Sequence, residues 1–123
     1  MRGRRLLAVA GVAALTPLFA MSVMAEGAGQ YSVAGSNTTE KTKYQGTATI
    51  SKTGNSTWQV VEIIGNDTLD GFGIGDGKVI AVAYATDAGT QLALYTANPD
   101  GSYTGIWIGE DDKEVSTETL KPQ

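Results

Sequence analysis

The chain contains no cysteine and no histidine among its 123 residues. All three methionines and all three arginines lie within the first 24 positions. The two absences exclude disulfides, thiolate nucleophiles, Cys/His zinc sites and imidazole general bases. If the start of the chain is removed, methionine ligation of haem is excluded as well. We therefore expect no metal and no cofactor, and a fold that is stabilised by packing alone.

The first 25 residues have the pattern of a secretory signal peptide. Three arginines are followed by a mostly apolar run from Leu6 to Leu15, and the small residue Ala25 provides a cleavage site. We predict a signal helix over residues 1–25, cleavage after Ala25, and a location in the periplasm or outside the cell. The alternative is an uncleaved membrane anchor, because Leu6–Ala25 has about the 20 residues that a spanning helix needs. Pro17 within that stretch weakens the alternative.

The remaining chain is acidic. Six lysines and no arginine face thirteen aspartates and glutamates, which gives a net charge of about −7. Nucleic acids and anionic membranes are bound chiefly through Arg and Lys, so neither partner is expected. The length of this part suits one domain with a single core.

Hydrophobic periodicity after Ala25 predicts an all-β fold. Alternation with a period of two recurs between turn signals about every ten residues, and no stretch has the 3.6-residue period of an amphipathic helix. Short connections force sequential strands to be antiparallel neighbours, so we predict an eight-stranded up-and-down meander that closes into a small barrel. A two-sheet sandwich is the alternative. Residues 26–30 are expected to be a flexible lead-in and residues 31–121 the barrel domain. The predicted strands are 30–35, 43–52, 57–64, 68–74, 78–85, 90–97, 102–109 and 114–120.

A weak repeat supports the barrel. Three segments have a large apolar residue two positions before a glycine: Tyr44–Ala48, Leu69–Gly73 and Tyr103–Trp107. A glycine that faces into a small barrel leaves room for a large side chain across the interior.

Five aromatic residues are either core or ligand-binding groups. They combine a large apolar area with a polar atom, which suits a ligand platform inside a barrel. The predicted ligand-binding residues are Trp58, Tyr84, Tyr95, Tyr103 and Trp107.

Glu62 and Glu118 lie inside predicted strands. Glu62 shares a strand face with Trp58 and Val60, so we expect partial burial and a raised pKa, or else an ion pair with a lysine on a neighbouring strand. Glu118 is expected to form hydrogen bonds within the sheet. Paired carboxylates can serve a glycosidase, but no second type of catalytic residue accompanies them, so we expect no catalytic residues and no enzyme activity.

The predicted strands 57–64 and 78–85 are apolar on both faces. An antiparallel strand with one wet face should alternate between apolar and polar residues. The pattern allows either a small domain with some exposed apolar surface or a homo-oligomer that buries this surface.

Motifs along most of the remaining chain resemble a family of small secreted bacterial domains called fibronectin-binding-like proteins. They include Tyr44-x-Gly46-Thr-Ala-Thr-Ile50, Gly77-x-x-Ile80-Ala-Val-Ala-Tyr84 and the closing Thr117-Glu-Thr-Leu120. The meander and Gly105-x-Trp107 also have a more distant avidin-like character, without the biotin-site motifs of avidin. The resemblance implies adhesion and supplies no catalytic residues.

We therefore expect a secreted or periplasmic, non-enzymatic binding or adhesion module that takes a protein or small-molecule ligand. The alternative is a structural, envelope-associated homo-oligomer, and a small hydrolase is a third and weaker hypothesis.

Overall fold

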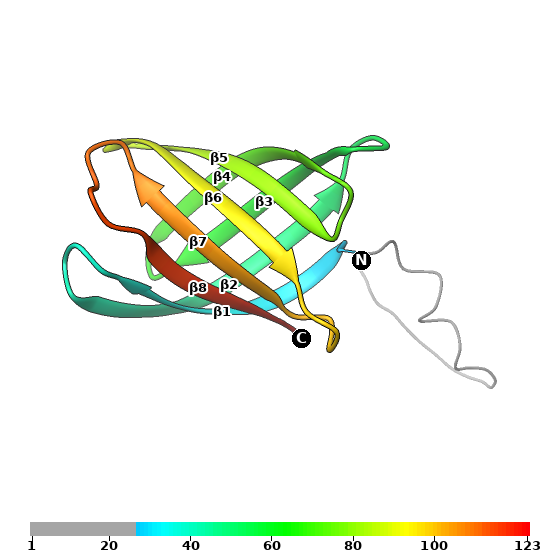
Figure 1. The fold of residues 1–123 in the computed structure, drawn as a ribbon, viewed down its shortest axis with the longest axis horizontal. Coiled ribbons are helices and arrows are strands. Elements are labelled where there is room, and N and C mark those ends of the chain that lie inside the picture. Colours follow the sequence, from blue (N-terminus) through cyan, green and yellow to red (C-terminus); the bar gives the residue numbers. More distant parts are fainter. Residues whose placement is uncertain (1–26) are drawn as a thin grey trace.

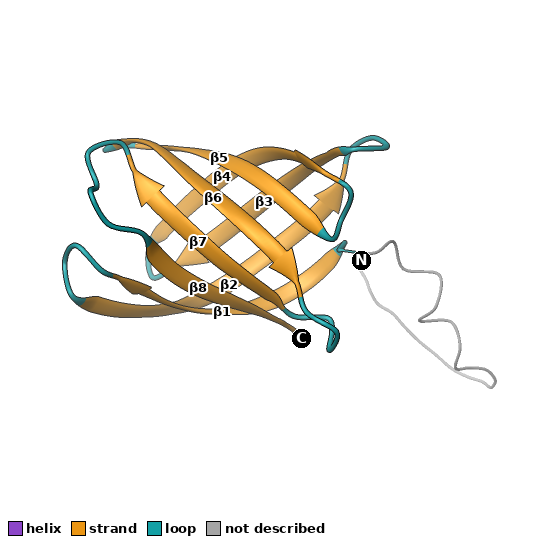
Figure 2. Ribbon diagram, in the orientation of Figure 1, coloured by secondary structure: helices purple, strands orange, loops and turns teal. Residues whose placement is uncertain are grey.

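The computed structural model of the protein describes residues 27–123 (Figure 1). It consists of eight antiparallel strands, along which side chains point alternately into the barrel and out to solvent. Each strand pairs with the next, and β1 also pairs with β8, so the sheet closes into a barrel (Figure 2). The eight-stranded barrel prediction is confirmed, and the sandwich alternative is wrong. The strands are β1 (Gly29–Asn37), β2 (Thr42–Lys52), β3 (Thr57–Ile64), β4 (Asp67–Gly75), β5 (Val79–Thr86), β6 (Gly89–Ala97), β7 (Tyr103–Gly109) and β8 (Ser116–Pro122).

The strand boundaries differ from the predicted ones chiefly in β8. This strand runs over Ser116–Pro122, whereas the sequence pattern suggested 114–120. Val115 is half exposed and lies in the preceding loop, so its apolar character is not a sign of an inward-facing strand residue. β1 begins at Gly29, within the expected lead-in. The predicted signal peptide lies outside the described residues. Within the described residues, no helix has the length and apolar character to span a membrane.

Aspartates fix two of the turns. In the turn between β6 and β7, Asp100 Oδ1 accepts hydrogen bonds from the Ser102 amide (2.9 Å) and hydroxyl (2.6 Å), and Gly101 has φ of +89°. These bonds lower the pKa of Asp100. In the turn between β4 and β5, the amides of Lys78 and Val79 donate to Asp76 and lower its pKa in the same way. Turn chemistry of this kind sets where each strand ends.

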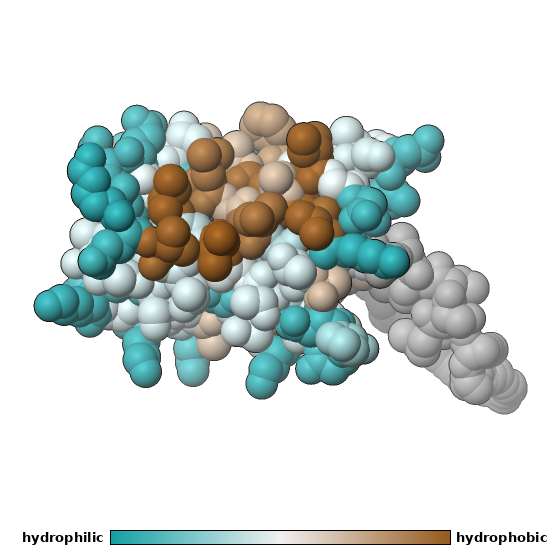
Figure 3. Space-filling view, viewed as in Figure 1, coloured by the Kyte–Doolittle hydropathy of each residue, from teal (hydrophilic) through white to brown (hydrophobic). Residues whose placement is uncertain are grey.

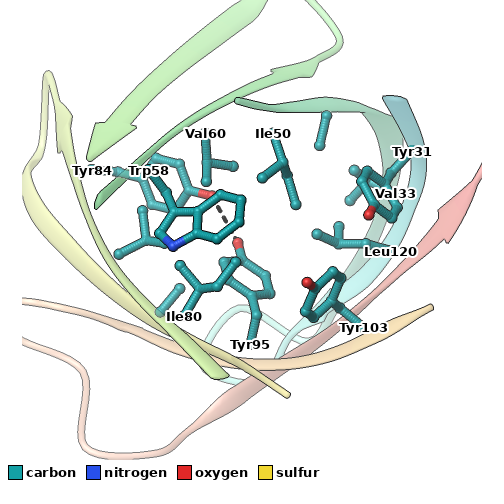
Figure 4. Close-up of a cluster of buried hydrophobic side chains, with 13 residues drawn as sticks. Tyr31, Val33, Ile50, Trp58, Val60, Ile80, Tyr84, Tyr95, Tyr103 and Leu120 are labelled. Atoms are coloured by element: carbon teal, nitrogen blue, oxygen red, sulfur yellow. Dashed lines mark hydrogen bonds between the residues drawn. The ribbon is translucent and has the colours of Figure 1, made fainter. Parts of the chain in front are cut away.

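Side chains fill the barrel interior at the end where the β2–β3, β4–β5 and β6–β7 turns meet, here named the closed end. Trp58, Tyr31 and Tyr103 are buried there with aliphatic residues from β1, β2, β3, β5 and β8 (Figure 4). Their polar atoms bond to backbone carbonyls: Trp58 Nε1 donates to Gly75 (2.9 Å), Tyr31 to Gly27 (2.8 Å), and Tyr103 to Gly77. The polar groups buried at this end thus have local partners.

Three inward glycines each face a tyrosine on the adjacent strand. In the strand register Gly35 pairs with Tyr44, Gly71 with Tyr84, and Gly105 with Tyr95. A Cβ atom on these glycines would lie 2.3, 2.6 and 2.8 Å from the respective tyrosine rings. The glycines therefore let each ring lie against the neighbouring backbone. The repeat predicted space for a large side chain at Gly71 and Gly105, but across the interior rather than on the adjacent strand. This packing directs three phenols into the opposite half of the barrel.

Candidate functional site

A cavity of about 290 Å³ occupies the other half of the barrel interior, here named the open end. It lies near the β1–β2, β3–β4, β5–β6 and β7–β8 loops. Side chains with exposed positions, including Glu40, Thr42 and Asp67, form its rim, and buried residues form its floor. The interior is therefore filled at one end and hollow at the other.

The floor of the cavity is a hydrogen-bonded cluster centred on Tyr95. Tyr95 donates to Glu118 Oε2 at 2.7 Å, and its Oη also lies 3.2 Å from Glu62 Oε2. The hydroxyls of Tyr84 and Tyr95 are 2.7 Å apart (Figure 4). Tyr44 donates to the second oxygen of Glu118, also at 2.7 Å. Three phenols and two carboxyl groups from β2, β3, β5, β6 and β8 thus form one polar network, here named the Tyr–Glu cluster.

The contacts around Tyr95 limit where the protons of the Tyr–Glu cluster can lie, because one hydroxyl proton cannot be donated to two carboxyl groups. A tyrosine hydroxyl donates one hydrogen bond and can accept two. When Tyr95 donates to Glu118, Tyr84 donates to Tyr95. The third contact of Tyr95 is then satisfied if Glu62 carries a proton and donates it. All three contacts around Tyr95 therefore fit a neutral Glu62 beside Glu118.

Electrostatics agree with this arrangement. Only 3 % of Glu62 and 4 % of Glu118 is exposed to solvent. Burial raises the pKa of Glu62 to about 9, and the adjacent Glu118 contributes further to the increase. Burial also raises the pKa values of Tyr84 and Tyr95 far above that of an ordinary tyrosine. Glu62 is therefore uncharged at neutral pH. The expectation of burial and a raised pKa agrees with the structure, which places Glu62 against phenols and another carboxyl group rather than in an ion pair.

Trp107 forms part of the cavity wall. Its ring contacts that of Tyr44 edge to face, with 6.3 Å between centroids and 64° between planes. Among residues 27–123, its Nε1 is the one buried side-chain polar atom without a hydrogen-bond partner. A buried donor left without a partner costs about 1–3 kcal/mol. The wall therefore has a donor without a hydrogen bond of ordinary length, although the Trp107 indole lies close enough to the Tyr44 hydroxyl to offset part of the rise in the pKa of that phenol.

The structure separates the five predicted ligand-binding residues into two groups. Tyr84, Tyr95 and Trp107 line the cavity together. Trp58 and Tyr103 lie in the core of the closed end, where backbone carbonyls accept their hydrogen bonds. All five side chains are aromatic with a polar atom, and all five point into the barrel. The two groups differ only in their position along the barrel axis.

Sequence reasoning missed Tyr44 and Glu118 as site residues. A usable signal was present for Glu118, because it alternates with Ser116 and Leu120 on the inward face of β8. A carboxyl group in the apolar phase of a strand indicates either a partner inside the barrel or a functional group. Tyr44 begins the glycine repeat, but its contact with Glu118 joins residues 74 positions apart.

The outer wall carries a second feature, an apolar face over β4 to β7. The register aligns two rows across these strands: Phe72, Ala83, Leu92 and Ile108 in one, and Ile74, Ala81, Leu94 and Ile106 in the next. Figure 3 shows these apolar side chains gathered on one side of the barrel. The exposed apolar residues predicted for β5 thus belong to a wider surface, here named the apolar face.

Two comparisons with known proteins gave no match. No protein-family model matches the chain, and no curated protein matches it. The resemblance to fibronectin-binding-like domains therefore stays a prediction.

Proposed function

We propose that this protein is an exported, non-enzymatic binding module that takes a small organic molecule into the open end of its barrel. The observation that carries the proposal is the cavity of about 290 Å³, with its aromatic wall and polar floor. Small-molecule sites typically combine apolar and aromatic walls with a few converging polar groups, in cavities of about 300 Å³ or more. This cavity is at the small end of that range and suits a compact ligand.

Binding is favoured over hydrolysis by the state of the two carboxyl groups. In a glycosidase they flank the scissile bond, one as a proton donor and the other as a base or nucleophile. Here Glu62 and Glu118 are both almost completely buried and meet at the same phenol oxygen. Because both carboxyl groups lie side by side at the floor of the cavity, they do not flank a substrate bond from two sides. Adhesion rests on the family resemblance alone, whereas the cavity supports small-molecule binding.

The two tryptophans allow a direct test of where a ligand binds. The chain has only Trp58 and Trp107, one at each end of the barrel, so its ¹H–¹⁵N spectrum should contain two indole signals. We expect small aromatic fragments to shift the Trp107 indole signal and to leave that of Trp58 in place. Trp107→Phe assigns the two signals. A fragment library, including neutral and charged members, that never moves the Trp107 signal would refute the proposal.

A second candidate function is self-assembly through the apolar face. Phe72 is 75 % exposed, and a surface hollow of about 230 Å³ beside Leu92, Ile106 and Val115 lies on the same face. A projection and a hollow on one face can fit a second copy of the chain related by two-fold symmetry, which requires a self-complementary surface. The two aligned rows contain no charged residue, so two copies of this acidic chain could meet there without placing like charges in contact.

The area of the apolar face is compatible with the centre of a dimer interface. Strands about 4.8 Å apart, with outward residues about 7 Å apart along each strand, give the apolar face an area of a few hundred Å². A stable dimer buries about 800 Å² per subunit, so neighbouring threonines such as Thr96 and Thr104 would complete the contact. Light scattering after size exclusion should give the mass of a dimer at tens of micromolar, and Phe72→Gln should shift it to a monomer. A wild-type monomer at that concentration would reject this candidate.

A further inference from the structure

The lining of the cavity is electrostatically one-sided. It includes four carboxyl-bearing side chains, Glu40 and Asp67 at the rim and Glu62 and Glu118 at the floor, and it includes no lysine. The described residues contain no arginine at all. A concave site lined by one sign of charge concentrates ligands of the opposite sign. The rim therefore favours the approach of a cation.

The floor offers hydrogen-bond acceptors at the depth where a ligand would end. Glu118 accepts from Tyr44 and Tyr95, and Glu62 lies on the other side of the Tyr95 hydroxyl. Each carboxyl oxygen has more than one lone pair, so both groups retain capacity to accept. A primary ammonium group has three N–H donors and can donate to both carboxyl groups at once.

The walls suit the rest of such a ligand. The rings of Tyr44, Tyr84 and Trp107 line the same cavity as the carboxyl groups. Aromatic faces attract a cation within about 6 Å and also cover an apolar stem. The small volume restricts the ligand to about the size of an arylalkylamine.

We propose that the cavity binds a small primary amine as its ammonium form, held at the floor by Glu62 and Glu118, with release of one proton from this carboxyl pair. This inference rests on the proposed binding function and adds the class of ligand. The protons balance: the amine arrives protonated, Glu62 gives its proton to solvent, and the ammonium then donates hydrogen bonds to two carboxylates. The groups that face Glu62 are Tyr44, Tyr84, Tyr95 and Glu118, and none of them can supply a positive charge in place of the ligand.

Four probes of similar shape separate charge from hydrogen bonding. They are phenethylamine, its neutral analogue 2-phenylethanol, the anion 3-phenylpropionate and the quaternary cation phenyltrimethylammonium. We expect phenethylamine to bind at least about tenfold more tightly than 2-phenylethanol, because it donates to charged acceptors. The quaternary cation has no N–H donor and should bind more weakly than phenethylamine. The anion should not bind measurably.

Proton release is measured by titration calorimetry near pH 7.5 in phosphate and in Tris, which differ in ionisation enthalpy. The dependence of the observed heat on the buffer should indicate release of close to one proton per phenethylamine. Glu62→Gln should remove that release and weaken phenethylamine binding about tenfold or more. Asp87→Asn makes the same replacement of a carboxyl group by an amide in the exposed β5–β6 turn outside the cavity, and it should alter neither quantity.

The outcomes distinguish this inference from the proposed function. If 2-phenylethanol shifts the Trp107 indole signal and binds as tightly as phenethylamine, the cavity is a binding site but not an amine site. If phenyltrimethylammonium binds as tightly as phenethylamine, or if phenethylamine binds without release of a proton, the ammonium group is not held by Glu62 and Glu118 and the inference is wrong. If no probe shifts the Trp107 signal, and the fragment library does not either, the proposed function fails as well.

Discussion

The buried carboxyl group of Glu62 should make the protein less stable as the pH rises from about 5 to about 8. The pKa of Glu62 is about 9 in the folded chain, against 4.5 for an ordinary glutamate. Between these values the folded state holds a proton that the unfolded state has lost. The stabilisation from Glu62 is therefore fully present below about pH 4.5 and is lost as the pH rises toward 9.

The magnitude follows from the linkage of protonation to folding. A difference of one bound proton changes the free energy of unfolding by about 1.4 kcal/mol per pH unit, or by about 4 kcal/mol from pH 5 to pH 8. This is an upper value, and it is a large part of the 5–15 kcal/mol that stabilises an ordinary domain. With a denaturant slope near 2 kcal/mol/M, the urea midpoint should fall by about 2 M over this range.

Few other groups in the chain interfere with the measurement. The chain has no histidine and no cysteine, the groups that most often titrate in this range. Hydrogen bonds lower the pKa values of Asp76 and Asp100, so the stability that these two provide is lost only in more acidic solution. The raised pKa values of the buried tyrosines act in alkaline solution.

The assay is urea unfolding, followed by tryptophan fluorescence at several pH values, of wild type, Glu62→Gln and Glu118→Gln. We expect Glu62→Gln to lose the pH dependence. Glu118→Gln should keep part of it, because burial is a larger cause of the raised pKa than the neighbouring carboxyl group. A wild-type midpoint that is constant from pH 5 to pH 8, or a slope that persists in Glu62→Gln, would refute a protonated Glu62.

Three further predictions concern the packing of the two ends. Gly105→Ala should lower the free energy of unfolding, measured by urea titration, by about 1–3 kcal/mol, because the new Cβ would lie 2.8 Å from the Tyr95 ring. Gly109→Ala in the same strand is the control: the nearest atom to its new Cβ is 3.4 Å away, so the loss of unfolding free energy should be clearly smaller. Trp58→Phe should cost about 2–3 kcal/mol in the same assay, because a 2 % exposed ring loses both packing and a hydrogen bond to backbone. Trp107→Phe should cost less than about 1 kcal/mol, because it removes a donor that has no partner, and a loss as large as that of Trp58→Phe would contradict the distinction between the two ends.

The strands and their antiparallel order could be predicted because they depend on local signals. Period-two alternation and turns such as Asn98–Gly101 mark each strand, and connections this short leave sequential strands no other partner. The predicted start of β8 was wrong because Glu114 and Val115, both exposed, lie in the loop before Ser116.

The candidate site was only partly predictable. Tyr84, Tyr95 and Trp107 could be selected by type, but Trp58 and Tyr103 have the same type and phase and lie at the closed end. Strand register and strand tilt decide whether an inward-facing residue lies at the closed or the open end. Both depend on how all eight strands pair around the barrel. Glu62 was suspected from its apolar neighbours on one strand, whereas its cluster with Glu118 forms only when β3 and β8 meet across the interior.

By itself, the sequence determined that this chain has no thiol or imidazole chemistry and that it forms eight sequential antiparallel strands, because composition and alternation are local properties. Tertiary structure decided that the barrel is filled at one end and hollow at the other. It also brought two carboxyl groups, three phenols and the unpartnered indole of Trp107 together around that hollow. The physical reason is that residues far apart in sequence come together only when the barrel closes. Closure also buries Glu62, and this burial raises the pKa of its carboxyl group.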